Sequence, residues 1–165
     1  MRIIGGGGGG LIGSQTLVNQ SACEFVNLPA TGKLVLDFAG VRVRTTGQPI
    51  IVRFSHDNGA NYIATASYGY DREGAGAGQS NSATGIQISD AMTTNVASFA
   101  SGTVSIYAPD PDGQNRREIA WQMALLDASN FAAGNNGGGH SHNPGGAEIN
   151  AIQIFAASGN LDGIF

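Results

Sequence analysis

The sequence predicts an all-β protein, one antiparallel β-sandwich of about eight strands with jelly-roll-like connections, and three observations support this class. Apolar and polar residues alternate with period two in most apolar segments, as in half-buried strands. Turn-forming residues separate these segments at short, regular intervals. The best candidate helix, over 89–100, contains the poor helix formers Thr93, Thr94 and Val96. A chain of 165 residues has the size of one domain, which we place at 11–165.

The first ten residues are predicted to form an arm outside this domain. Residues 5–10 are six consecutive glycines, which have no side chains to bury and a high backbone entropy. Ile3 and Ile4 precede them and are the candidate anchor residues. We therefore expect 1–10 to be an anchor and tether that attaches the domain to a partner without helping it to fold. A disordered tail is the alternative.

The first strong strand pattern covers 34–43. Its apolar residues fall at even positions from Leu34 to Phe38 and then at the odd positions 41 and 43. The phase therefore slips by one residue at Ala39-Gly40. Because glycine readily adopts the bulge conformation, we predict a β-bulge at this point.

Turn signals divide the remainder of the chain into further strands. His56-Asp57-Asn58-Gly59 predicts a tight hairpin turn, since Asn-Gly supplies the positive φ that such turns need. Two glycine-rich segments, 73–85 and 132–146, are predicted to be long surface loops. The further strands are expected over 51–54, 62–70, 84–89, 103–107, 119–126 and 149–155. The side chains expected in the core are Phe38, Phe54, Trp121, Met123 and Ile154.

Composition argues against several classes of protein. Eight basic and twelve acidic residues give a net charge of −4, and clustered basic residues are missing apart from Arg116-Arg117, so we expect no nucleic-acid binding. We expect no membrane span, because no stretch approaches the ~20 apolar residues needed to cross a bilayer. Cys23 is the only cysteine, so we expect a small apolar residue and synthesis in a reducing cytoplasm.

Motifs that resemble catalytic or cofactor sites have simpler explanations. Ser55, His56 and Asp57 have the side chains of a catalytic triad, but adjacent strand residues point to opposite faces. The glycine run contains G-x-G-x-x-G without the strand, helix and acidic residue of a dinucleotide site. Asp110-Pro-Asp112-Gly113 begins like a calcium loop, yet Trp121 stands where that loop needs Glu. We therefore expect no catalytic residue, no cofactor and no enzyme activity.

Five residues remain as candidate contacts with a ligand or a partner. His140 and His142 can share one face of an extended segment, but the further ligands of a structural zinc site are missing nearby, so we expect solvated histidines and no metal. Tyr68, Tyr70 and Phe131 lie beside polar, glycine-rich segments, and aromatic rings with one wet end suit a platform for sugar rings. Strand packing or a subunit contact is the competing explanation for the aromatic residues.

Three stretches of the chain combine strand and turn signatures in a fixed order. The motif F-x-N-L occurs at Phe25–Leu28, R-F-S-x-D-x-G at Arg53–Gly59, and S-G-N at Ser158–Asn160. This order resembles small β-sandwich structural proteins of tailed-bacteriophage virions. Similar chains continue from the S-G-N turn into a short final strand ending in L-Y-G. Here the turn is followed by Leu161–Phe165, so the pairing of a last strand is left open.

The resemblance implies a non-enzymatic virion protein that is made in the host cytoplasm and assembled into the particle. We expect an oligomeric surface appendage, tail-associated or fibre-like, attached through the N-terminal arm. Its partners would be other virion proteins and copies of itself, with a homotrimer as the first choice. A capsid decoration protein on the phage head is the alternative. A glycan-binding module that recognises the host surface is an alternative from another functional class. A hydrolase is disfavoured because the sequence lacks a catalytic constellation.

Overall fold

Antiparallel strands form nearly all of the regular structure in the computed structural model. It describes residues 2–5, 10–29, 32–64, 68–73, 78–82, 84–94, 99–107, 117–126, 132–141 and 149–164. These ranges contain fourteen strands and no helix, which confirms the all-β antiparallel class. The strand number exceeds the predicted eight, because several short strands have too few residues to show a period-two pattern.

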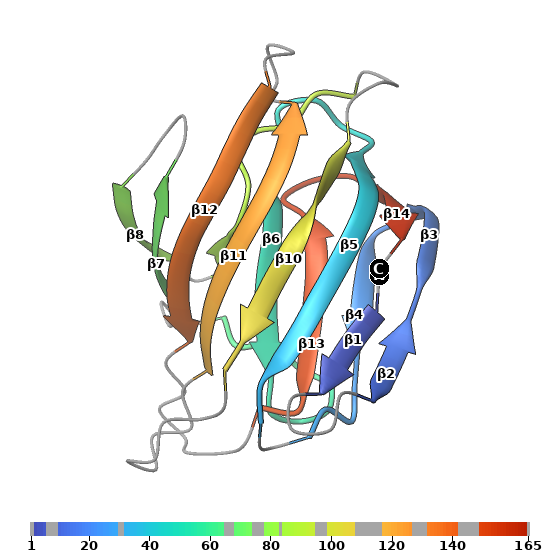
Figure 1. The fold of residues 1–165 in the computed structure, drawn as a ribbon, viewed down its shortest axis with the longest axis vertical. Coiled ribbons are helices and arrows are strands. Elements are labelled where there is room, and N and C mark those ends of the chain that lie inside the picture. Colours follow the sequence, from blue (N-terminus) through green and yellow to red (C-terminus); the bar gives the residue numbers. More distant parts are fainter. Residues whose placement is uncertain are drawn as a thin grey trace.

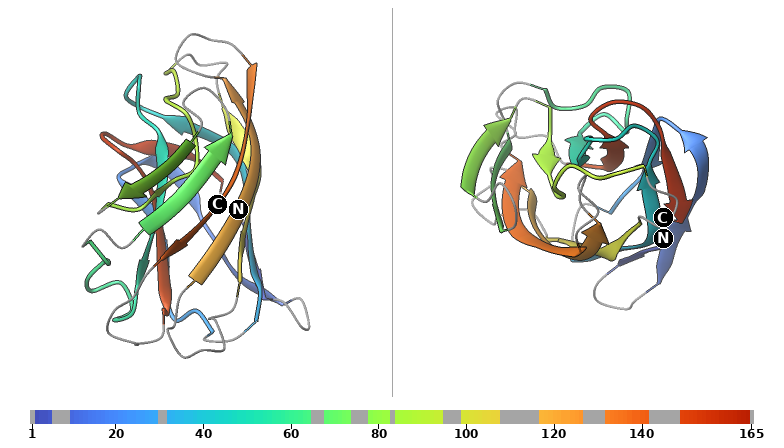
Figure 2. Two further views of the ribbon diagram at one scale, coloured as in Figure 1. Left: turned by 90° about the vertical axis from the view of Figure 1, so that its left-hand side faces the viewer. Right: turned by 90° about the horizontal axis from the view of Figure 1, so that it is seen from above.

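The strands form two sheets that face each other across the core (Figures 1 and 2). The large sheet follows the order β2 (Leu11–Ser14), β1 (Arg2–Gly5), β5 (Leu34–Val43), β10 (Ala100–Ile106), β11 (Arg117–Leu126), β12 (Ala132–Ser141), β7 (Tyr68–Glu73) and β8 (Gly78–Ser82). Beside this order, β14 (Leu161–Ile164) pairs with β5, and β3 (Thr16–Gln20) pairs with β14. The small sheet follows the order β4 (Ala22–Phe25), β13 (Ala151–Ala156), β6 (Ile50–Ser55) and β9 (Ile86–Gln87).

The core lies between the two sheets and contains every side chain predicted for it. Phe38, Phe54, Trp121, Met123 and Ile154 are all buried, and Trp121 is only 4% exposed. On β11 the buried residues alternate with Glu118, Ala120, Gln122 and Ala124, which face outward. The period-two pattern therefore identified the inward face of this strand correctly.

The predicted β-bulge lies within β5. Four residues of β5, from Phe38 to Val41, lie opposite three residues of β10, from Ala100 to Gly102. Gly40 has φ of 64°, a conformation that favours glycine, and its N–H donates to Ser101 Oγ at 3.1 Å. The bulge keeps Val41 and Val43 on the buried face after the slip in phase.

The outer edge of β5 is shared between two short strands. Its first half pairs with β1, from Gly5 opposite Leu34 to Arg2 opposite Asp37. Its second half pairs with β14, which in turn pairs with β3. The last strand is therefore paired, which answers the question that the sequence left open.

The N-terminal residues differ from the expected arm. Arg2–Gly5 form β1 inside the large sheet, between β2 and β5, and therefore take part in the domain. The expectation that 1–10 contributes nothing to folding is wrong for these four residues. Four residues ahead of a glycine run show no detectable period, whereas the edge of β5 offers unpaired backbone groups that a strand can satisfy. Residues 6–9 lie outside the described part of the chain.

The two glycine-rich segments also differ from the expected loops. Most of 132–146 is β12, which lies between β11 and β7, and part of 73–85 is β8, which pairs with β7. A Cβ on Gly137 would lie 2.8 Å from Trp121 Cε2, closer than real side chains approach. Glycine occurs here because the indole fills the space of a side chain, so glycine content was a misleading loop signal.

Two of the expected strands have different bounds. The prediction of a strand over 62–70 is corrected to β7, Tyr68–Glu73, and 56–61 forms turns and bends after β6. The predicted strand over 84–89 shortens to the two residues of β9. In both regions the small and polar residues carry too weak a period to set the boundaries.

Candidate functional site

The turn after β6 is held by its own side chains, but it does not form the predicted hairpin, because β6 pairs with β13 and β9 and not with the following strand β7. Ser55 Oγ donates to Asp57 Oδ1 at 2.6 Å and accepts the N–H of Gly59 at 3.0 Å. Asp57 also accepts the backbone N–H and the side-chain amide of Asn61, each at 2.7 Å. The Ser55 hydrogen bond, followed by those from Asn61, lowers the pKa of Asp57 to about 2. Ser55 and Asp57 therefore stabilise the turn that the sequence predicted over His56–Gly59.

Asparagines connect this turn to the first stretch of the resemblance and to the start of β13. Asn27 and Asn58 have φ of 55° and 61° and bond to each other, Asn27 N–H to Asn58 Oδ1 at 2.6 Å and Asn58 Nδ2 to Asn27 Oδ1 at 3.0 Å. Asn58 N–H also donates to Asn150 Oδ1 at 2.8 Å, just before β13. The recognisable polar residues of these stretches are thus used to fix turns against one another.

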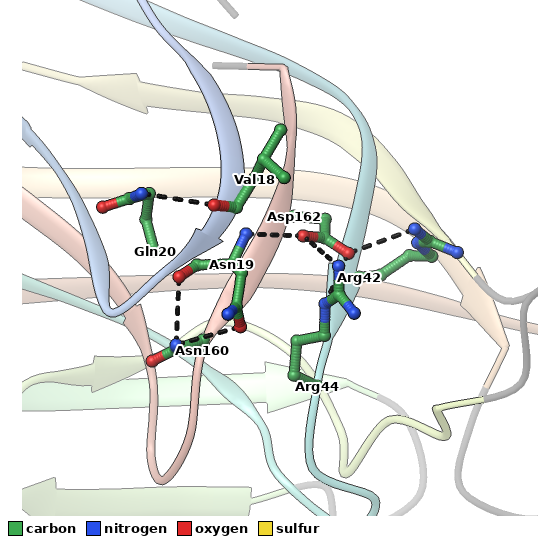
Figure 3. Close-up of polar contacts among 7 residues, drawn as sticks. All are labelled: Val18, Asn19, Gln20, Arg42, Arg44, Asn160 and Asp162. Atoms are coloured by element: carbon green, nitrogen blue, oxygen red, sulfur yellow. Dashed lines mark hydrogen bonds and ion pairs between the residues drawn. The ribbon is translucent and has the colours of Figure 1, made fainter.

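A charged cluster joins β3, β5 and β14 on the outer face of the large sheet (Figure 3). The Asp162 carboxylate accepts the Asn19 N–H at 2.7 Å and forms ion pairs with Arg44 at 2.7 Å and Arg42 at 3.1 Å. Burial acts to raise the pKa of Asp162, but the hydrogen bonds from Arg44 and Asn19 and the two positive charges outweigh it, so the pKa is lowered. Asn160 adds two bonds to Asn19 at the start of β14.

A hollow lies on the outer face of the large sheet, and we call it the outer hollow. It has a volume of about 800 Å³ and lies over β7, β11 and β12, near the end of β10. Its lining residues are Gly69, Tyr70, Asp71, Tyr107, Glu118, Ile119, Ala120, Gly138, Gly139 and His140. The small residues form the floor, and the polar side chains rise around it.

The strand register explains how the polar groups of the outer hollow meet. Glu118 on β11 lies directly opposite His140 on β12, and His140 lies opposite Gly69 on β7. In the next row, Gly138 lies between Ala120 and Asp71. Since Asp71 and Glu118 belong to strands separated by β12, about 10 Å of sheet lies between those strands.

A buried arginine fixes the rim of the outer hollow from below. Arg117 precedes Glu118 and is buried, and its guanidinium donates to the carbonyl of Tyr107 at 3.3 Å. It also donates to the carbonyls of Pro29 and Ile149, each at 3.1 Å. These bonds hold the backbone of Tyr107 beside β11. Lys33 lies 5.3 Å over the Tyr107 ring and restrains it further.

The sequence-predicted contact residues have different positions. His140 lines the outer hollow, whereas Tyr70, although it borders the hollow, is half-buried and packs against the core. Tyr68 is a core residue, 1% exposed, whose hydroxyl accepts the Phe54 N–H at 3.0 Å and donates to the Ile63 carbonyl at 3.0 Å. It therefore fits the strand-packing explanation and is not a surface contact. Phe131 and His142 lie outside the described residues.

Asp71, Glu118 and Tyr107 were missed as site residues. Their position becomes apparent only when the glycine-rich segment is recognised as β12, since β12 brings β7 beside β11. Across the described ranges, no three His, Cys, Asp or Glu side chains are grouped so that they could hold a metal ion. Burial raises the pKa of the Cys23 thiol to about 12, with smaller effects from nearby charges, so the thiol is neutral.

A second polar cluster covers the outer face of the small sheet. The Arg53 guanidinium lies 4.6 Å from the ring centroids of both Tyr62 and Phe155, and its Nε donates to Gln153 Oε1 at 2.5 Å. The Gln153 amide donates in turn to the Glu24 carboxylate. The chain of contacts crosses β6, β13 and β4, so it stabilises the sheet.

Comparisons with protein-family models, curated proteins and solved structures found no match to this chain. Within the described residues, no helix is long and apolar enough to cross a membrane.

Proposed function

We propose that this chain is a non-enzymatic structural protein of a bacteriophage virion, an oligomeric surface appendage that is tail-associated or fibre-like. The proposal rests on what the residues of the resemblance motifs do in the structure. Asn27, Asn58 and the Ser55–Asp57 pair are engaged in turns that tie together the ends of β4, β6 and β13 in the small sheet. A scaffold whose recognisable residues serve its own rigidity suits a building block of a particle.

An exposed apolar edge supports assembly. Strand β2, which pairs with β1, and strand β3, which pairs with β14, lie at one margin of the molecule (Figure 1), and no charged residue occurs between Arg2 and Glu24. Leu11 is 60% exposed and Val18 68% exposed on this edge. Because monomeric proteins protect sheet edges with charges, prolines or bulges, an uncharged apolar edge fits contact with a second copy of this chain. A homotrimer remains our first choice, with the β1–β2 segment at the contact in place of a free arm.

Two measurements test the proposal. Immunogold labelling of intact purified particles, with copy number from mass spectrometry, should place the chain on the tail or its fibres. Label on the head would favour the decoration-protein alternative, and absence from purified particles would overturn both.

Light scattering of the purified chain tests the edge separately. Val18→Lys should dissociate the oligomer. Thr103→Lys, which adds the same charge on the exposed outer face of β10, should leave it intact. A wild-type monomer, or equal effects of the two changes, would contradict self-assembly through this edge.

A further inference from the structure

We propose that the outer hollow is a binding site for a neutral saccharide. This site is independent of where the protein resides in a particle. The first observation is the floor: Gly138 on β12 and Ala120 opposite it on β11 leave the sheet backbone almost bare at the centre of the hollow. A Cβ at Gly138 would have Ile119 O, 3.7 Å away, as its nearest neighbour, so the space above the floor is open.

The polar groups around the floor suit hydroxyl groups. Asp71 and Glu118 are exposed carboxylates on opposite sides of the floor, and each can accept hydrogen bonds from two hydroxyls. His140 lies between them in the strand order and can donate or accept. Hydrogen-bond acceptors on opposite sides of a small flat floor match the hydroxyl groups around the edge of a sugar ring.

Glycine also positions the imidazole. A Cβ at Gly69 would lie 2.7 Å from His140 Cε1 and 3.1 Å from its Nε2, so the ring lies flat over the place of the missing side chain. The imidazole is thereby held low at the edge of the floor. A saccharide bound in the hollow would contact a ring nitrogen of His140 at its edge and the backbone of the sheet beneath it.

An aromatic wall completes the site. Tyr107 is 40% exposed at the rim, and its backbone is fixed by Arg117. The apolar C–H face of a pyranose can pack on such a ring, while the hydroxyls around its edge reach the carboxylates.

Charge selects among ligand classes. Two carboxylates and no Lys or Arg are among the lining residues, and the Lys33 ammonium lies at the rim, 5.3 Å over the Tyr107 ring, so repulsion by the carboxylates disfavours phosphates and acidic sugars on the floor. A metal ion is disfavoured because the described residues hold no group of three potential ligands. A neutral, hydroxyl-rich ligand is the class that satisfies the acceptors without adding like charge.

Two glycines of β12 give a matched test. Gly138 lies in the floor, whereas Gly134 lies on the same face of the same strand, in equally open space and outside the hollow. Gly138→Leu should fill the hollow and Gly134→Leu should not. Circular dichroism and thermal unfolding would verify that both variants are folded.

The full chain is first screened on an array of neutral, acidic and amino-group-bearing oligosaccharides, and the bound members are then titrated by calorimetry. We expect neutral members to bind, with affinity falling at least about tenfold in Gly138→Leu and staying within about twofold in Gly134→Leu. Glu118→Gln and Gly69→Ala should also weaken binding, the latter by displacing His140. The proposal is overturned if no neutral member binds, if only acidic or amino members bind, or if the two leucine variants bind alike. None of these outcomes depends on particle location, so they leave the proposed virion role to its own experiment.

Discussion

Gly137 and Gly138 are neighbours on β12, yet they face opposite sides of the large sheet and have different reasons to be glycine. A side chain at Gly137 would collide with the Trp121 indole, which occupies its place in the core. A side chain at Gly138 would enter the open outer hollow. The first glycine is required by packing, and the second leaves a surface accessible. Residue type alone does not distinguish the two cases, whereas the face of the strand does.

The same contrast extends over the whole large sheet. Its inner face carries large apolar side chains such as Leu36, Val104 and Met123, all buried. Its outer face carries small or polar residues such as Thr103 and Gln122, both exposed. We infer that the inner face supplies most of the stability and that the outer face is free to bind. The following predictions test this division, from the largest expected effect to the smallest.

Trp121→Ala should have the largest effect. The change removes a nearly fully buried indole and leaves a cavity, so we expect a loss of about 3–5 kcal/mol in the free energy of unfolding. Urea unfolding followed by circular dichroism measures it. A loss below about 1 kcal/mol would show that the inner face does not dominate stability.

Gly137→Ala should be the next largest, at about 1–3 kcal/mol, because the added methyl would overlap both the indole and the backbone carbonyl oxygen of Asp71. Combining it with Trp121→Phe removes the indole atoms nearest to the new methyl. The double variant should therefore lose less stability than the sum of the two single variants. Strict additivity would mean that the strain at Gly137 comes from elsewhere.

The sequence was informative wherever side chains alternate and uninformative wherever glycine or a short strand conceals the alternation. The pattern over 34–43 predicted the strand bounds and the bulge at Gly40, because each buried residue there is large and apolar. In β12 the inward positions are small or polar: Asn135 and Ser141 are buried, and the space at Gly137 is filled by Trp121, so no local apolar pattern could identify this strand. His140 was therefore placed in a loop and Tyr70 at the end of a strand, with nothing to indicate that their segments are neighbours.

Deleting residues 1–10 tests whether the edge strand β1 belongs to the stabilised part of the sheet. The deletion exposes the backbone edge of Leu34–Asp37 and leaves β2 without its partner. We expect a loss of about 1–2 kcal/mol, which corresponds to a fall of several degrees in the melting temperature. As a control, changing Ile3 and Ile4 to Thr should keep the strand and preserve most of the stability. An unchanged melting temperature after the deletion would show that residues 1–10 do not stabilise the domain, as the sequence alone predicted.

Asp162→Asn examines a polar cluster on the outer face. It removes the charge that pairs with Arg42 and Arg44, and we expect a loss of about 1 kcal/mol near neutral pH. The pKa of Asp162 is lowered in the folded protein, so its contribution is complete above the ordinary value of about 3.9 and disappears as the pH falls through the folded-state value. The stability difference between wild type and variant should thus be constant from pH 7 to about 5 and then shrink on acidification. A difference that grows in acid would contradict the assignment.

Gly138→Ala should have the smallest effect on stability. The new methyl would meet only Ile119 O, at an ordinary contact distance of 3.7 Å, and no positive φ has to be maintained in this part of β12. Alanine also restricts the unfolded chain more than glycine does, which acts in favour of the folded state. We therefore expect a change within about 0.5 kcal/mol in either direction, measured beside Gly137→Ala under the same unfolding conditions. If Gly138→Ala destabilises the protein as much as its neighbour does, the outer face at this point is packed rather than open, and the outer hollow loses the floor on which its proposed ligand would rest.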